Sequence, residues 1–369
     1  MTIDTQLLQE KCKKILDAIS ANKNFKKSTN NSADILELEV ANGALYMNVT
    51  DKEYFVSVKI PLESPEEFHA VVNASLFLSL ITKMTTKTTT MKTKDNALII
   101  KGNGNYKLPL IFDGSSLVEL PRIKLENITS EFNIKNSVLQ SILKYNDKIL
   151  YTGGCNFPIF YVDNKGAVTI SHSACINSFE LEQPVSLMLS ETLVKLFKLF
   201  RADTIKFSMA LDARADGAIQ QKVMFFDGDV MLTSILVTDE KLTKNFPIGA
   251  IRERAGKSAP YSVVIDKEVL IEAIERLALF KDCVDHSVFM TFTQGDVTLT
   301  DSHKASEEVV VYTNSCLIVP EEGYLAKFSV DDILLILDTL DDQYLNISFG
   351  DKALTITRDN IKYMLPECR

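Results

Sequence analysis

The sequence of 369 residues lacks the short patterns that mark most metal and nucleotide sites. Its four histidines and six cysteines are scattered, and no C-x-x-C pair provides the close spacing that a structural zinc site needs. The stretch Gly102-Asn103-Gly104 predicts a hairpin turn, because no G-x-x-x-x-G-K-[ST] loop surrounds it. We therefore expect no metal, no cofactor and reduced cysteines.

Long apolar runs and targeting patterns are also missing. No stretch reaches the roughly 18 consecutive apolar residues of a membrane helix, and MTIDTQLLQEKCKK has no signal-peptide pattern. We expect a cytoplasmic protein without a membrane partner. The net charge of −9 excludes a protein that coats nucleic acid with its whole surface. It leaves open a protein whose charges are sorted by face.

Candidate catalytic groups are few. His172 and Cys175 lie three positions apart in a predicted strand, so their side chains are expected on opposite faces and not as a nucleophile pair. The aspartates near residues 331–342 lack the spacing and the glycine of a calcium loop. We expect no catalytic residue, and hence no enzyme.

What the sequence does contain is an internal repeat. Six segments begin with a residue suited to cap a helix, and after most of these caps apolar residues follow three and four positions on, the segment at Asn136 being the weakest. Their caps are Asp4, Asn73, Asn136, Ser190, Asp266 and Ser329. The pattern predicts one amphipathic helix of about three turns after each cap.

Alternating apolar and polar runs follow each predicted helix and predict antiparallel strands with one buried face. The caps Asp4, Asn136 and Asp266 recur with a period of about 130 residues. We therefore predict an α+β protein of three repeated domains, each with two helices backed by antiparallel sheets. The predicted domains are residues 1–126, 127–254 and 255–369, with boundaries in the loops LVELPRIKLENITS and RERAGKSAP.

This organisation resembles the bacterial DNA polymerase III β subunit, the sliding clamp. The threefold repeat covers nearly the whole chain. FPIGAIRERAGKSAP stands where that family has a Phe/Tyr-Pro loop, and the tail Tyr363-Met364-Leu365-Pro366 is similar to the family's C-terminal strand. Two departures, Ser171-His172-Ser173-Ala174-Cys175-Ile176 and Pro247-Ile248-Gly249, indicate a divergent clamp of the kind that a phage or another mobile element carries.

The resemblance implies a DNA replication protein. Two copies of the chain would close head to tail into a ring with helices inside, and tether a polymerase to duplex DNA. Its partners would be double-stranded DNA of any sequence, a second copy, and a DNA polymerase and clamp loader that bind through short linear motifs.

The resemblance also implies three sets of site residues. Those expected to contact DNA phosphates are Lys11, Lys14, Lys23, Lys26, Lys27, Lys83, Lys144, Lys148, Lys195, Lys198 and Arg201. Those expected to line a peptide pocket are Thr152, Ser171, Ser173, Cys175, Ile176, Pro247, Ile251, Arg252, Tyr363, Leu365 and Pro366. Those expected at the dimer interface are Tyr106, Leu108, Leu279 and Phe280.

Other interpretations remain open from the residues alone. The lysines fit a solvated helix face, and the tail fits a strand that only completes the last domain's sheet. The chain itself fits a non-catalytic scaffold of duplicated α+β units without a DNA role. A hydrolase needs a cluster of polar site residues, which the sequence does not display.

Overall fold

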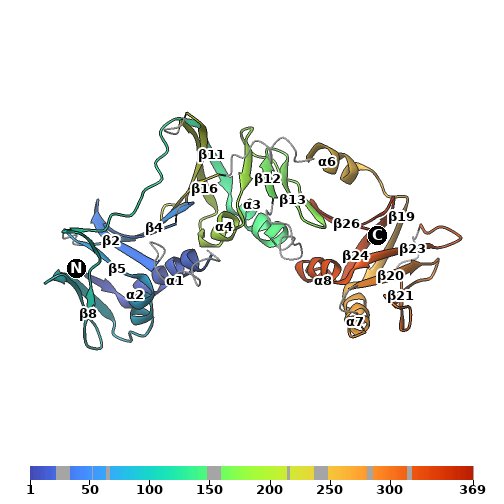
Figure 1. Cartoon of the computed structure of the whole chain (residues 1–369), viewed down its shortest axis with the longest axis horizontal. Coiled ribbons are helices and arrows are strands. Elements are labelled where there is room, and N and C mark those ends of the chain that lie inside the picture. Colours follow the sequence, from blue (N-terminus) through green and yellow to red (C-terminus); the bar gives the residue numbers. More distant parts are fainter. Residues whose placement is uncertain are drawn as a thin grey trace. The chain divides into compact units, whose positions relative to one another are not determined.

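The computed structural model describes residues 1–21, 34–51, 53–63, 67–147, 159–213, 217–236, 248–280, 286–313 and 318–368, with backbone only at 159–160. The chain divides into two compact units (Figure 1). Unit 1 comprises Met1–Leu139 and Thr192–Thr238, and unit 2 comprises Gln140–Glu191 and Asp239–Arg369. The middle third of the sequence thus contributes to both units. The division into three domains stays a prediction.

Apart from α6, each described helix begins at or directly after a predicted cap. They are α1 (Thr5–Ala21), α2 (Ala74–Thr82), α3 (Asn136–Ser141) continued by the π-helical turn Ile142–Asn146, α4 (Glu191–Leu196) continued by the 3-10 turn Phe197–Leu199, α6 (Ile248–Gly256), α7 (Lys267–Ala278) and α8 (Val330–Thr339). No described helix is long and apolar enough to cross a membrane.

Four of the predicted caps make their hydrogen bonds. The side chain of Asn73 accepts the N–H of Leu76 at 2.8 Å, and Ser329 accepts that of Asp332 at 3.2 Å. Asp4 accepts the N–H of Leu7 at 2.9 Å, and Asp266 caps α7 in the same way. These side chains satisfy N–H groups that have no partner in the first helical turn.

Unit 1 contains two main antiparallel sheets. The larger has the order β11 (Ile128–Lys135), β16 (Thr204–Ala213), β17 (Ile219–Phe226), β18 (Val230–Ile235), β4 (Tyr54–Pro61), β3 (Ala44–Thr50), β2 (Ile35–Ala41) and β5 (His69–Asn73). The smaller has the order β1 (Thr2–Asp4), β6 (Thr88–Lys94), β7 (Ala97–Lys101) and β8 (Asn105–Pro109), and β9 (Phe112–Asp113) pairs with β10 (Ser116–Leu117).

Unit 2 repeats this design. Its larger sheet has the order β15 (Ser186–Leu189), β12 (Ile159–Asp163), β13 (Gly166–Ile170), β14 (Ala174–Asn177), β26 (Ile361–Pro366), β25 (Ala353–Arg358), β24 (Tyr344–Gly350) and β19 (Tyr261–Asp266). Its smaller sheet has the order β22 (Glu307–Val311), β21 (Asp296–Asp301), β20 (Ser287–Phe292) and β23 (Tyr324–Ser329). The predicted α+β class with antiparallel sheets is confirmed.

In each unit a pair of helices lies side by side over the sheets, α1 with α2 and α7 with α8 (Figure 1). The core of unit 2 joins α7 and α8 to both sheets, and the rings of Phe292 and Phe349 stack with centroids 4.0 Å apart. Sequence periodicity identified these amphipathic helices because burial of one face stabilises them.

One part of the fold differs from the sequence prediction. The stretch predicted as a loop and domain boundary, RERAGKSAP, begins inside helix α6, which ends at Gly256. Its weak amphipathicity explains the error, since only Ala255 of α6 is fully buried. Five residues, RERAG, continue the helix that starts at Ile248.

A buried carboxylate holds the connection that enters β11. Asp212 Oδ1 accepts the backbone N–H of Asn127 at 2.8 Å, and Oδ2 lies 3.0 Å from Lys222 Nζ. Lys222 also donates to the carbonyl of Lys124 at 2.9 Å. The hydrogen bond from the N–H of Asn127, together with Lys222, lowers the pKa of Asp212 to about 2.

We predict that Asp212→Asn lowers the free energy of unfolding by about 2 kcal/mol at pH 7. Because the folded pKa lies below the unfolded one, this contribution is complete above about pH 5 and falls to about half by pH 3. Urea unfolding at both pH values measures it. Asp113→Asn, at an exposed aspartate of β9, serves as the control. A loss that does not shrink toward pH 3 contradicts the assignment.

Candidate functional site

Helix α6 lies on one face of the large sheet of unit 2. Ile248, Ile251 and Ala255 pack against Ile176 of β14 and Met364 of β26. We call this contact and the cavities beside it the α6 face. The opposite face of the same strands packs into the core of unit 2. The C-terminal strand therefore contributes to the core with one set of side chains and to the α6 face with the other.

A partly buried ion pair fixes α6 to the sheet. The guanidinium of Arg252 makes two hydrogen bonds to the carboxylate of Asp163, at 2.5 and 2.7 Å, and a third to the carbonyl of Gly166 at 3.3 Å. Burial acts to raise the pKa of Asp163, but the hydrogen bonds from Arg252 and from the N–H of Lys165 outweigh it and lower that pKa. At the other end of the helix, Lys362 Nζ donates to the carbonyl of Ala255.

Three cavities flank α6. The smallest, of about 150 Å³, has a mainly apolar lining: Ile170, His172, Ser173, Ala174, Ile251, Arg254, Ala353, Met364 and Pro366. A second of about 450 Å³ lies along Ile176, Arg252 and Lys362. The third, of about 810 Å³, shares Arg254 and Pro366 with the first.

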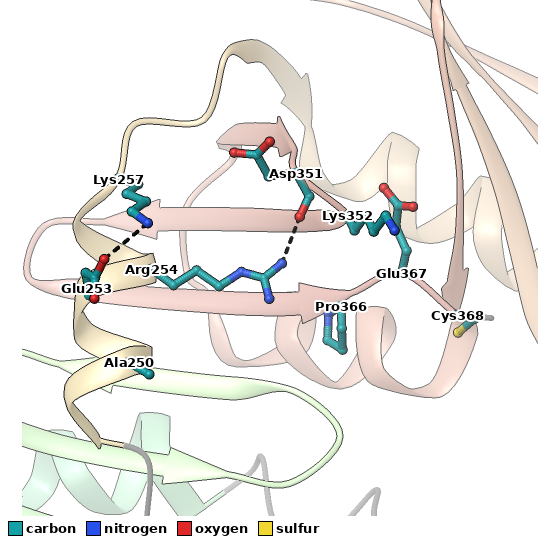
Figure 2. A pocket seen from close by; sticks show the side chains of 9 residues that line it. All are labelled: Ala250, Glu253, Arg254, Lys257, Asp351, Lys352, Pro366, Glu367 and Cys368. Atoms are coloured by element: carbon teal, nitrogen blue, oxygen red, sulfur yellow. Dashed lines mark hydrogen bonds and ion pairs between the residues drawn. The ribbon is translucent and has the colours of Figure 1, made fainter.

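The largest cavity is charged (Figure 2). The side chain of Arg254 extends from α6 and donates to the carbonyl of Asp351 at 2.9 Å, while Lys257 pairs with Glu253 at 3.2 Å on the helix (Figure 2). Pro366 borders this cavity as well as the smallest one. The α6 face thus offers a small apolar cavity with a wide polar rim.

Two serines beside the smallest cavity, Ser171 and Ser173, have side-chain hydroxyls that make no hydrogen bond within the described part of the chain. Both hydroxyls are buried. Both lie in the tight turn between β13 and β14, where the N–H of Ser171 donates to the carbonyl of Ser173 at 2.8 Å. Because a buried hydroxyl without a partner is costly, the turn is suited to a ligand that supplies one.

The structure brings together part of the predicted pocket. Ser173, Ile251 and Pro366 line the smallest cavity, and Ile176 and Arg252 line the second. Thr152 and Pro247 lie outside the described residues.

Three predicted pocket residues face the core instead, which corrects the prediction. Cys175, Tyr363 and Leu365 are at most 1% exposed and belong to the core of unit 2. The hydroxyl of Tyr363 donates to the carbonyl of Tyr145 at 3.1 Å, and burial raises the pKa of the Cys175 thiol. Adjacent residues of a strand point to opposite faces, so Met364 lines the cavity and its neighbours cannot. The same alternation would have identified Met364 from the sequence.

Several predicted DNA-contacting cations are already paired. Lys11 is 5% exposed and its ammonium group lies 2.6 Å from Asp229, so it is not accessible to a phosphate, which corrects that assignment. Lys198 pairs with Asp17 at 3.2 Å, and Lys144 pairs with Asp341. Burial lowers the pKa of the half-buried Lys14.

The remaining predicted cations differ in exposure. Lys83 and Arg201 are exposed, and Lys195 is half-buried. Lys23, Lys26, Lys27 and Lys148 lie outside the described residues.

Of the predicted interface residues, Leu279 and Phe280 stand out at the end of α7, 81% and 56% exposed. Tyr106 lies half-buried on β8, the last strand in the order of its sheet. Leu108 is 4% exposed and belongs to the core, which corrects its assignment. In unit 2, β22 ends the order of the smaller sheet and exposes Val309 and Val311.

Residues 1–128 match the model of the DNA polymerase III beta subunit, N-terminal domain. The whole chain superposes on the DNA polymerase sliding clamp of Bacillus subtilis with 16% identity and a TM-score of 0.78, covering 100% of this chain and 98% of that one. Residues 1–128 thus match the beta-clamp family model, and the whole chain has the fold of solved sliding clamps.

Other solved clamps share this fold. The DNA polymerase III beta subunit of Thermotoga maritima gives 16% identity and a TM-score of 0.75, covering 100% of this chain and 99% of that one. The sliding clamp of Pseudomonas aeruginosa bound to griselimycin gives 15% identity and a TM-score of 0.79 over the same shares. No curated protein matches the sequence. The resemblance inferred from the repeat and the tail is therefore confirmed, while the site residues of this chain rest on its own geometry.

We predict that Arg252→Ala loosens α6, because it leaves the Asp163 carboxylate without its partner. Hydrogen exchange of the amides of Ile248–Gly256 should accelerate about tenfold or more, with little change in α7. Lys257→Ala on the same helix, which removes only an exposed ion pair, is the matched control. Equal exchange in both variants would show that the Arg252 pair does not anchor the helix.

Proposed function

We propose that the protein is a DNA sliding clamp, a processivity factor that closes as a ring around duplex DNA and tethers a polymerase through a peptide bound at the α6 face. The observation that carries the proposal is the match of the whole chain, end to end, to sliding clamps at TM-scores of 0.75–0.79. The family model over residues 1–128 supports it independently from sequence.

The ring would form from two copies joined head to tail. Two sheet edges support this arrangement, since β8 and β22 are each the last strand in the order of a sheet. Strand edges and exposed apolar residues such as Leu279 and Phe280 need protection from non-specific association. A contact between unit 1 of one copy and unit 2 of the other would provide that protection at both strand edges.

Contact with DNA would be independent of sequence. Cations that lie on or beside the repeated helices, such as Lys83 and Arg201, would contact phosphates without reading bases. The persistence of the clamp on DNA would come from the closed ring, so weak contacts suffice and allow sliding. No catalytic role is part of the proposal.

The polymerase and the clamp loader would bind through short peptides at the α6 face. The small apolar cavity with Ile251 and Met364 accepts one or two Leu or Phe side chains, and the charged rim around Arg254 accepts the flanking polar groups. The buried hydroxyls of Ser171 and Ser173 would gain partners from the peptide. This combination favours a peptide over a small metabolite.

Retention on circular DNA tests the proposal. The protein is loaded on a nicked circular duplex with a clamp loader, and the complex is separated by gel filtration before and after linearisation. A ring stays on the circle and is lost from the linear form. A scaffold protein without a DNA role binds neither form, and that result would refute the proposal.

We predict that Leu279→Ala with Phe280→Ala yields monomers and abolishes retention on circular DNA, because it removes the exposed apolar side chains of the proposed interface. Light scattering at low micromolar concentration measures the dimer. Ile219→Ala, at a residue 64% exposed on β17, should leave a dimer. A double variant that remains dimeric would place the interface elsewhere.

We predict that Ile251→Ala with Met364→Ala weakens binding of a polymerase-tail peptide at least tenfold, while dimerisation and retention on circular DNA persist. The reason is that both side chains line the smallest cavity, where buried apolar anchors supply most of the affinity. Fluorescence anisotropy with a labelled peptide measures the affinity. Ile219→Ala, an exposed apolar change on β17 and away from α6, is the control. Unchanged affinity in the double variant would exclude the cavity as the peptide site.

A further inference from the structure

Some of the cations expected to face DNA have carboxylate partners within the described part of the protein. In unit 1, Lys198 follows α4 and pairs at 3.2 Å with Asp17 of α1, each side chain being 38% exposed. In unit 2, Lys144 of the π-helical turn pairs with Asp341, which follows α8. The same arrangement therefore occurs once in each unit, on helices that belong to different parts of the sequence.

The pair in unit 2 belongs to a larger charged cluster. Arg358 of β25 lies 2.8 Å from Asp342 and 3.7 Å from Asp341. Lys144 also lies over the ring of Tyr145, 5.2 Å from its centroid. The hydrogen bond from Lys144 lowers the pKa of Asp341, so the carboxylate is ionised at neutral pH. With Asp359, 3.9 Å from Arg358, three carboxylates here surround two cations.

A carboxylate that pairs with a lysine competes with a DNA phosphate for it. An unpaired lysine that neutralises a phosphate releases a condensed counterion from DNA, and this release drives binding. A lysine that must first leave its aspartate exchanges one anion for another, and the displaced aspartate then repels the DNA. Such a pair contributes little to affinity and little to its salt dependence.

We infer that Asp17 and Asp341 are internal substitutes for DNA phosphates, which occupy Lys198 and Lys144 and keep the DNA affinity of the clamp low. The inference rests on the proposed function and deepens it, because it names the residues that set the strength of the DNA contact. A ring held weakly slides, whereas a ring held by many phosphate contacts would not move freely.

The test measures affinity for a short duplex as a function of salt, by fluorescence anisotropy. Asp17→Asn and Asp341→Asn should each steepen the slope of log K against log salt by about 0.9, and raise affinity about eightfold at 0.1 M salt. The double variant should gain about 60-fold. Asp113→Asn removes the same charge from an exposed position on β9 and should change affinity less than twofold.

A double-mutant cycle distinguishes two causes of a gain in affinity: release of the paired lysine, and a general change in the electrostatic potential of the protein. Lys144→Ala alone should change affinity less than twofold, and in that background Asp341→Asn should lose its eightfold gain. Lys198→Ala should act in the same way on Asp17→Asn. If the gain persists without the lysine, or if neither aspartate variant steepens the slope, the inference is wrong.

Failure of the proposed function gives a different result. If the wild-type chain is retained on circular DNA but the slopes do not change, only the inference falls. If neither the wild type nor the double aspartate variant is retained on circles or binds the duplex at low salt, the proposed function falls and the inference falls with it.

Discussion

The pairing of β26 between β14 and β25 is the constraint on which the rest of unit 2 depends. It fixes which side chains of the C-terminal strand face the core and which face α6. Tyr363 and Leu365 complete the core, and Met364 and Pro366 form the wall of the smallest cavity. One strand thus contributes to the core with one set of side chains and to the candidate peptide cavity with the other, because successive side chains of a strand point in opposite directions. Tyr363, Met364 and Leu365 are buried for these two reasons.

The sequence predicted most of the architecture and only part of the site. Caps such as Asn73 and Asp266 and the apolar period predicted the helices, since both signals are local. The signal that predicted the tail as a strand was also local. The region of the α6 face was predicted from the resemblance to a family. The α6 helix was missed because its amphipathicity is weak, with only Ala255 fully buried. The face of Met364 was missed because a family motif gives a position along the chain and not a side-chain direction.

Electrostatic assignments were the least predictable from sequence. Lys11 has the spacing of a helical surface residue, yet Asp229, 218 positions away, neutralises it. Lys144 and Asp341 are 197 positions apart, and Lys198 and Asp17 are brought together from different helices. Such partners depend on tertiary structure, so a count of lysines on helices overstates the charge that is free to meet DNA.

This pairing also resolves an apparent conflict in the composition. A clamp needs enough positive charge to stay oriented around DNA, but the chain carries a net charge of −9. If carboxylates neutralise part of the cations on the helices proposed to face DNA, the residual attraction between the protein and DNA is small. The repulsion between the negatively charged chain and DNA is screened within about 8–10 Å at physiological salt. In the proposed ring, the duplex would be confined by the closed ring and only weakly attracted to its wall. Confinement and attraction would then be independent properties, and the proposed role of the aspartates is to adjust the attraction without affecting the confinement.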